Sequence, residues 1–362
     1  MSQELDSERR RFLSATARAL AAAPLGLAGW PGQSTEAATQ LPPQMVLSSL
    51  DRTTQWLNSA PLTAAGLQGK VVLVDFWTYT CINWIRTAPY IRTWADKYRE
   101  QGLVVVGVHT PEFPFEHDLD NVRRAVKDLR VDYPVVTDND FAVWRAFQNQ
   151  YWPALYFVDA QGKVRHHQFG EGEYERLERV IGRLLRDAGN RAAGPEQTPV
   201  EARGVEVAAD WGSLRSPENY LGYARTLDFA SPGGMRADVR YAYRIPNRLS
   251  LNQWALSGEW TLKEGAAALN GADGSIAYRF HARDLHLVMG AATPGRPVPV
   301  RVRIDGLPPG AAHGLDVDAQ GNGTLSEPRL YQLVRQPGRI ADRQFEITFP
   351  DAGVEAFAFT FG

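Results

Sequence analysis

The sequence has little cysteine: 362 residues contain a single one, Cys81. One thiol excludes a disulfide within the chain and a zinc or iron–sulfur site built from four thiolates. The seven histidines do not compensate, since His166 and His167 are neighbours in a strand-like run and are expected to point to opposite faces. We therefore predict no metal site and no cofactor, and any chemistry at Cys81 must use one sulfur or a second molecule.

An excess of charge of one sign is also missing, with 39 Lys plus Arg against 41 Asp plus Glu. This balance gives no reason to expect a nucleic acid or an anionic membrane as partner. No uninterrupted apolar run reaches the roughly 18 residues that a membrane-spanning helix needs. We expect a mature chain without stable membrane insertion, and the length predicts two domains.

The N-terminal segment has the pattern of a targeting signal. Arg9 and Arg10 precede Phe12 and Leu13, and an alanine-rich, weakly apolar stretch follows, which resembles a twin-arginine export signal. The alternative is a plain N-terminal tail, and Arg18 within the apolar stretch argues against a membrane span. We predict a signal and linker over residues 1–40 and a periplasmic or otherwise exported protein.

Strand-like and helix-like segments alternate between residues 50 and 185. Buried strands are expected at 69–77 and 103–110, a short extended segment at 133–138, and a hairpin at 154–170. Helical spacing marks 85–102, 121–131, 141–149 and 172–189. The pattern predicts an α/β domain with a central sheet and helices on both of its faces.

A segment rich in proline, glycine and charge follows at 190–204 and is typical of a linker. Beyond it, short alternating runs predict strands, for example at 284–290, 298–306 and 329–336. We therefore place an α/β domain at 41–189 and an all-β sandwich of jelly-roll type at 205–362.

Cys81 follows a buried strand at the point where the chain turns into a helix. The free N–H groups and the dipole of a helix N-terminus favour a thiolate, and such a site can lower a thiol pKa from about 8.5 toward 7 or below. A thiolate is the form that attacks disulfides and that peroxide oxidises. Its position makes Cys81 a candidate nucleophile.

Residues 50–187 resemble a thioredoxin-like domain of the TlpA and DipZ type, and the match is carried by 69–84, 104–113 and 151–162. In that family the strand-to-helix turn holds a Cys-x-x-Cys pair, whose first cysteine comes six residues after a strand aspartate. Counting from Asp75 gives Cys81 the place of the first, attacking cysteine. Trp84 replaces the second, which puts dithiol turnover in doubt and implies an external resolving thiol.

The same resemblance implies roles for residues around the cysteine. Pro153 matches a cis-proline beside the active-site turn, and Trp152 before it would pair its backbone with a substrate; a trans proline at a strand start is the alternative. Asp75 matches a buried acid that relays a proton, although a structural carboxylate is as plausible. Glu112 follows the next strand and is either catalytic or a solvated loop residue.

Aromatic residues surround the predicted turn. Trp77, Trp84 and Trp152, together with Tyr79, are expected either to form a rim that holds a substrate or to pack in the core. Thr78 lies three residues before Cys81, a spacing also found in peroxiredoxins, although the proline of that family is absent. A one-cysteine thiol peroxidase with antioxidant activity is therefore an alternative.

Residues 200–362 resemble the carbohydrate-binding-like sandwich that follows the thioredoxin-like domain in DipZ-type proteins, through 216–225, 254–260 and 356–362. Trp211, Trp254 and Trp260 are expected either to stack on sugar rings or to fill the core. A third hypothesis is that the thioredoxin-like unit has lost catalysis and serves as a binding scaffold, which the presence of the second domain favours.

The sequence as a whole favours an exported redoxin that exchanges disulfides through Cys81. Its expected partners are envelope protein thiols or disulfides, an external thiol reductant, and a carbohydrate or protein ligand of the second domain.

Overall fold

The computed structural model describes residues 43–53, 55–190, 199–293 and 295–362. The predicted export signal lies outside these residues, as does most of the predicted linker. Among the described residues, no helix has the length and apolar character needed to cross a bilayer.

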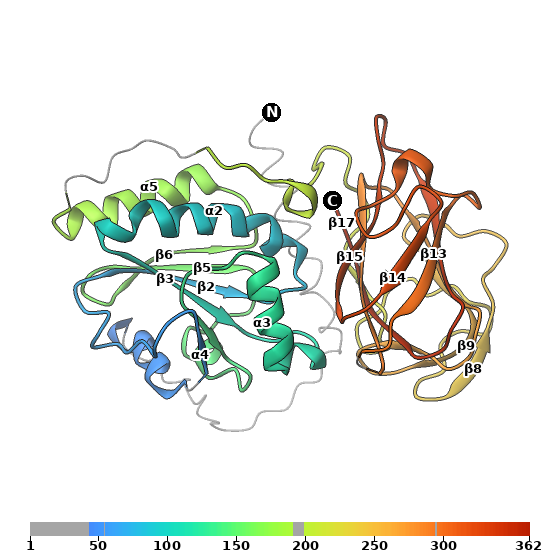
Figure 1. Cartoon of the computed structure of the whole chain (residues 1–362), viewed down its shortest axis with the longest axis horizontal. Helices are drawn as coiled ribbons and strands as arrows, with labels where there is room; N and C mark the ends of the chain where they lie inside the picture. Colours follow the sequence, from blue (N-terminus) through green and yellow to red (C-terminus); the bar gives the residue numbers. More distant parts are fainter. Residues whose placement is uncertain (1–42, 54, 191–198, 294) are drawn as a thin grey trace, which may run out of the picture. The chain divides into compact units, whose positions relative to one another are not determined.

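The first fold is a six-stranded sheet with helices on both faces (Figure 1). The strand order is β1-β4-β3-β2-β5-β6, in which β2, β3 and β4 are parallel and the other pairs are antiparallel. The strands are β1 (Trp56–Leu57), β2 (Val71–Trp77), β3 (Leu103–His109), β4 (Val135–Thr137), β5 (Ala154–Val158) and β6 (Val164–Phe169). The helices are α2 (Ile82–Tyr98), α3 (Leu119–Asp128), α4 (Ala142–Ala146) and α5 (Tyr174–Asp187), with short 3₁₀ turns η2 (Pro43–Arg52), η3 (Arg99–Gln101) and η4 (Pro114–His117).

Strand β2 lies at the centre of this sheet, and all seven of its residues are buried. Leu73 and Trp77 pack in the cluster that includes α2 and α5, whereas Val74 and Phe76 pack on the other face with α4. Figure 1 shows α2 and α5 side by side over one face. This explains why β2 reads as a continuous apolar run instead of an alternating one.

The predicted helices are found with shifted ends. α2 begins at Ile82, before the expected residue 85, and the chain leaves it through Gly102, whose φ of 89° is the left-handed conformation that favours glycine. α4 covers only five of the nine residues expected to be helical. The thioredoxin-like α/β prediction is confirmed.

The second region is one antiparallel sheet of eleven strands in which β14-β13-β16-β11-β9-β10-β17-β12-β15 follow one another, with β7 against β17 and β8 against β9. The strands are β7 (Asn219–Tyr220), β8 (Arg240–Tyr243), β9 (Trp254–Leu262), β10 (Ala267–Leu269), β11 (Gly274–Phe280), β12 (Asp284–Ala291), β13 (Val298–Ile304), β14 (Asn322–Leu325), β15 (Arg329–Arg335), β16 (Arg343–Phe349) and β17 (Val354–Phe361). Two 3₁₀ turns, η5 (Gly204–Glu206) and η6 (Gly310–Ala312), complete it.

Strand β9 takes part in both halves of this sheet. Its first residues pair with β11 and its last residues pair with β10, and Gly258 between them has a φ of 92°. Apolar residues of both halves share one core, so the sheet folds over on itself. The all-β prediction for this region is confirmed, while its assignment as a jelly-roll sandwich stays a prediction.

Candidate functional site

Cys81 is the N-cap of α2, directly after the turn that leaves β2. Its N–H donates to the carbonyl of Thr78 at 3.2 Å, and its carbonyl accepts the N–H of Ile85 at 2.9 Å, so the residue is held at the start of the first helical turn. The side chain is partly buried and the thiol is free. The sulfur therefore lies at a helix N-terminus, as predicted.

The electrostatics of the sulfur differ from the prediction. Burial raises the pKa of Cys81 well above its ordinary value, and the charges of Glu112 and Glu218 raise it further. The backbone N–H groups of Asn83 and Trp84 act in the opposite direction but are the weaker causes. The expectation of a lowered thiol pKa considered only the helix end and is wrong for this structure.

Trp84 occupies the place of a second cysteine, but its side chain does not line a groove. It is fully buried, and its ring stacks on the equally buried Trp77 with 4.2 Å between centroids. The expectation that these two rings form a substrate rim is therefore wrong. The alternative, in which they pack in the core, describes both.

Asp75 lies beneath the turn and holds this tryptophan. The Nε1–H of Trp84 donates to both carboxylate oxygens at 3.2 and 3.0 Å, and the hydroxyl of Tyr133 donates to Oδ2 at 3.1 Å. Burial raises the pKa of Asp75 to about 7, despite the two donors. In the family that this chain resembles, the matching carboxyl relays a proton during exchange. Here Asp75 binds Trp84, the residue that stands in the place of the second thiol.

Pro153 is preceded by a cis peptide bond from Trp152, as predicted. The indole of Trp152 is half-buried, donates to the carbonyl of Thr110 at 3.0 Å and lies 4.4 Å from the ring of Trp144. Among the aromatic residues predicted to form a rim, Trp152 is the one whose side chain keeps partial exposure. Its role in a substrate groove stays a prediction.

Glu112 is not the solvated loop residue that was considered, because its side chain is only 9% exposed. The hydroxyl of Tyr220 donates to it, and Arg225 lies 3.4 Å from its Oε1. Both partners belong to the second region, so two distant parts of the sequence meet at this carboxylate.

Glu116 is a site residue that the sequence reasoning missed. Its Oε2 accepts the N–H groups of Glu112 and Phe113 at 2.7 and 2.9 Å, and its Oε1 accepts the hydroxyl of Thr80 at 2.6 Å. Burial raises the pKa of Glu116 to about 7. This carboxyl ties the loop after β3 to the turn that carries Cys81. A glutamate four residues after Glu112, in a proline-flanked turn, was the available signal.

Thr78, the residue on which the peroxidase alternative depends, is fully buried.

Trp254 and Trp260 are fully buried in the core of the second region, whereas Trp211 is 45% exposed. Of the two alternatives for these tryptophans, core packing describes Trp254 and Trp260. Trp254 and Trp260 are therefore not available to stack on a sugar ring.

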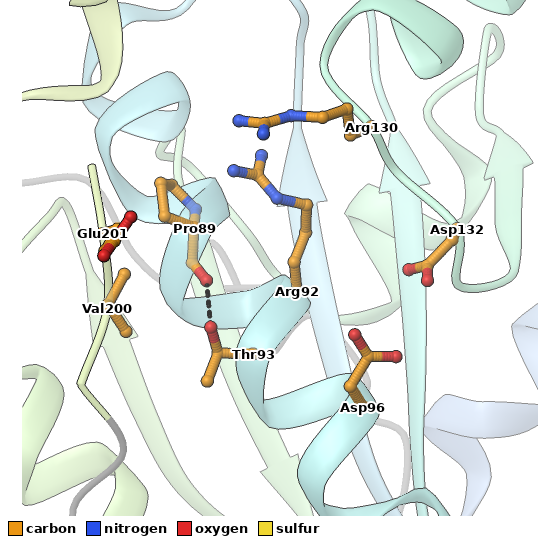
Figure 2. A pocket seen from close by; sticks show the side chains of 8 residues that line it. All are labelled: Pro89, Arg92, Thr93, Asp96, Arg130, Asp132, Val200 and Glu201. Carbon is orange, nitrogen blue, oxygen red and sulfur yellow. Dashed lines mark hydrogen bonds between the residues drawn. The ribbon is translucent and has the colours of Figure 1, made fainter. Parts of the chain in front are cut away.

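A cavity of about 320 Å³ lies away from the predicted site residues, none of which lines it (Figure 2). Figure 2 shows Arg92 and Arg130 turned toward each other at this cavity. Both pair with the buried Glu206, at 2.7 and 3.1 Å, so their charges are used to hold η5 against α2. In the part of the chain that the structure describes, no three His, Cys, Asp or Glu side chains group closely enough to hold a metal ion.

The fold and the position of Cys81 define a thioredoxin-like protein, and comparison with known proteins agrees with this class. Residues 49–167 match the AhpC/TSA family and residues 216–362 match the thioredoxin like C-terminal domain. The thiol-disulfide oxidoreductase YkuV of Bacillus subtilis is 32% identical over 130 residues, which are 36% of this chain and 87% of that protein. The chain belongs to the thioredoxin-like thiol–disulfide oxidoreductases.

A second relative extends over both regions. The protein DipZ of Mycobacterium bovis is 34% identical over 331 residues, 91% of this chain, and the chain spans 44% of its length. The solution structure of a thioredoxin-like protein in the oxidized form is 30% identical, with 39% of this chain and 96% of that chain covered and a TM-score of 0.36.

Proposed function

We propose that this protein is an exported thiol–disulfide oxidoreductase that works with one cysteine and depends on an outside thiol. The observation that carries the proposal is the position of Cys81, the N-cap of α2 in a chain of this family, with Trp84 in the place of a resolving cysteine. Export is supported by the twin-arginine-like pattern at residues 9–13.

The chemistry needs two steps and no cofactor. The Cys81 thiol loses its proton to solvent, and the thiolate attacks one sulfur of a substrate disulfide, which forms a mixed disulfide and releases the other sulfur as a thiolate that takes up a proton. Because Trp84 cannot attack the mixed disulfide, a second, external thiol must do so. Envelope proteins with thiols or disulfides are the proposed partners, and the second region is proposed to bind a protein or a carbohydrate.

A single-cysteine exchanger is expected to trap its own substrates. The wild-type protein should accumulate adducts with envelope proteins that a reductant dissolves, because no internal thiol releases them. Thiol-blocked lysates resolved on gels with and without reductant measure this. Cys81→Ser is the matched control, and a wild-type yield no higher than that of the control would contradict the proposal.

A second candidate, a binding scaffold without catalysis, is favoured by one observation: the partly buried sulfur has a raised pKa. A buried thiol of high pKa reacts slowly whatever its family. The two candidates differ at Cys81→Ala, which should abolish exchange but leave the binding of a scaffold's partner unchanged. The one-cysteine peroxidase stays a hypothesis.

A further inference from the structure

Three buried polar side chains stand side by side on the sheet of the second region. His286 on β12 pairs in register with Gln332 on β15 and with Thr360 on β17. Each of the three residues is at most 3% exposed. In the part of the chain that the structure describes, none of the polar atoms of these side chains has a hydrogen-bond partner. We call His286, Gln332 and Thr360 the polar face.

The polar face points toward the α/β domain. Successive residues of a strand point to opposite sides of the sheet, and Leu287 packs in the core of the second region. Val288, two residues after His286, packs instead in the apolar cluster that contains α2. Leu330 and Ala358, which lie two positions from the polar face on β15 and β17, pack in that cluster as well. The polar face is therefore part of the contact between the two regions.

Cys81 lies between two hydrogen bonds that join the regions. Two residues before it, the Tyr79 hydroxyl donates to the carbonyl of Pro328 at 3.4 Å. Five residues after it, Nη2 of the buried Arg86 donates to the carbonyl of Phe361 at 3.2 Å. The side chain of Cys81 is partly buried and packs against the apolar cluster to which both regions contribute. Separation of the two regions would therefore expose the sulfur.

The polar face opposes this closed contact. Buried polar groups in proteins are normally hydrogen-bonded. A buried donor or acceptor without a partner has lost its bonds to water and gained none in exchange, which destabilises the arrangement that buries it. Apolar packing holds the two regions together, and the polar face offsets part of that packing. Contacts between domains of one chain commonly permit such motion.

The closed contact has no place for a proton on His286. A protonated imidazole donates from both nitrogens, and neither nitrogen has an acceptor among the described residues. Three cations act on the ring, namely Arg86 of α2, Arg335 of β15 and Arg283 before β12. The one carboxylate in this group, Asp284, already binds Arg283 and Arg335. Burial, and then the charge of Arg86, lower the pKa of His286 from 6.5 to about 3.

We propose that this contact is a pH-sensitive switch: when His286 takes up a proton, the polar face separates from α2 and Cys81 becomes accessible. Water then solvates the imidazolium and the other two polar side chains. The closed state is fully stabilised above pH 6.5, and this stabilisation is lost as the pH falls toward 3. The ratio of open to closed protein should rise about thirtyfold between pH 8 and pH 5. The inference concerns access to the sulfur, whatever reaction Cys81 performs.

The rate at which 4,4′-dithiodipyridine modifies Cys81 in the full chain tests the switch, because this reagent reacts with thiols in acid as well as at neutral pH. The rate in the folded protein is divided by the rate in denaturant at the same pH, which corrects for the reactivity of the reagent and of an exposed thiol. We expect this rate ratio to rise about thirtyfold from pH 8 to pH 5. A ratio that stays constant, or a folded protein that reacts at neither pH, would overturn the inference.

Two histidine variants assign the rise to the polar face. His286→Gln keeps a polar side chain but takes up no proton, so it should remove most of the rise, whereas His167→Gln, at an exposed position of β6, should retain it. Asp75 and Glu116 have pKa values of about 7, and His109 is fully buried, so these groups could also respond to pH. Their effects would persist in His286→Gln, and a rise that survives in that variant would overturn the inference.

Thr360→Val is an independent variant of nearly the same shape. It removes a buried hydroxyl that has no partner among the described residues, so it should favour the closed state. We expect the rate ratio to fall about fivefold at both pH values while its rise from pH 8 to pH 5 remains. An unchanged or higher rate ratio would show that the polar face does not oppose the contact, and this result would overturn the inference even if His286→Gln failed to fold.

Discussion

Replacing Trp84 with cysteine is expected to turn a protein with no catalytic insulin reduction into one that reduces insulin with turnover. Residue 84 lies three positions after Cys81 in the first turn of α2, the spacing at which the family has its second thiol. The new thiol would resolve the mixed disulfide internally. Loss of the indole also frees Asp75, whose raised pKa suits it to accept the proton of a neighbouring thiol.

The same substitution removes a fully buried ring that stacks on Trp77, so we expect a loss of about 3–5 kcal/mol in the free energy of unfolding. Trp84→Ala is the matched control, because it makes a similar cavity without adding a thiol. Turbidity of reduced insulin and a urea titration measure the two effects. A folded Trp84→Cys protein that is no more active than Trp84→Ala would contradict the assignment of Cys81 as the attacking sulfur.

Replacing Asp75 with asparagine is expected to stabilise the protein relative to wild type as the pH rises. The folded pKa of Asp75 is about 7 against an ordinary value of 3.8, so the folded chain holds a proton that the unfolded chain has released. Stability from this group is present below pH 4 and is lost as the pH rises through 7. Three pKa units correspond to about 4 kcal/mol.

The asparagine can keep both contacts, with its oxygen accepting from Trp84 and its amide donating to Tyr133. The measurement is the difference in free energy of unfolding between Asp75→Asn and wild type, from urea titrations between pH 4 and 8. Asp187→Asn, at an exposed position on α5, controls for the substitution itself. A difference that stays constant over this range would show that Asp75 is ionised in the folded protein from pH 4 upward.

The local elements of the site could be predicted from sequence because they depend on short-range patterns. The apolar run of β2, the glycine after α2 and the motif around Pro153 each carry their own signal, and each is found where expected. The direction of Trp77 could not be predicted, because a strand buried on both faces gives no alternation that tells which face holds which residue.

The environment of the sulfur depends on contacts between distant segments. Glu112 reads as a loop carboxylate until Tyr220 and Arg225 cover it, and no local pattern places β7 beside that loop. Gly107 is a further example. A Cβ there would lie 3.0 Å from Nε1 of Trp77 and 3.0 Å from the ring of Tyr133, so this glycine makes room for the rings around Asp75. Sequence alone shows only a glycine in a strand.

The most direct test of the account is the pH dependence of Cys81 alkylation by iodoacetamide in the folded protein, because this neutral reagent reports both access to the sulfur and its pKa. The account predicts that the folded protein reacts, with a midpoint above that of the same cysteine in denaturant, and that Glu218→Gln moves the midpoint down. A midpoint at or below that of the unfolded chain would contradict the raised pKa of the buried sulfur. No reaction until the protein unfolds would contradict a nucleophilic role for Cys81.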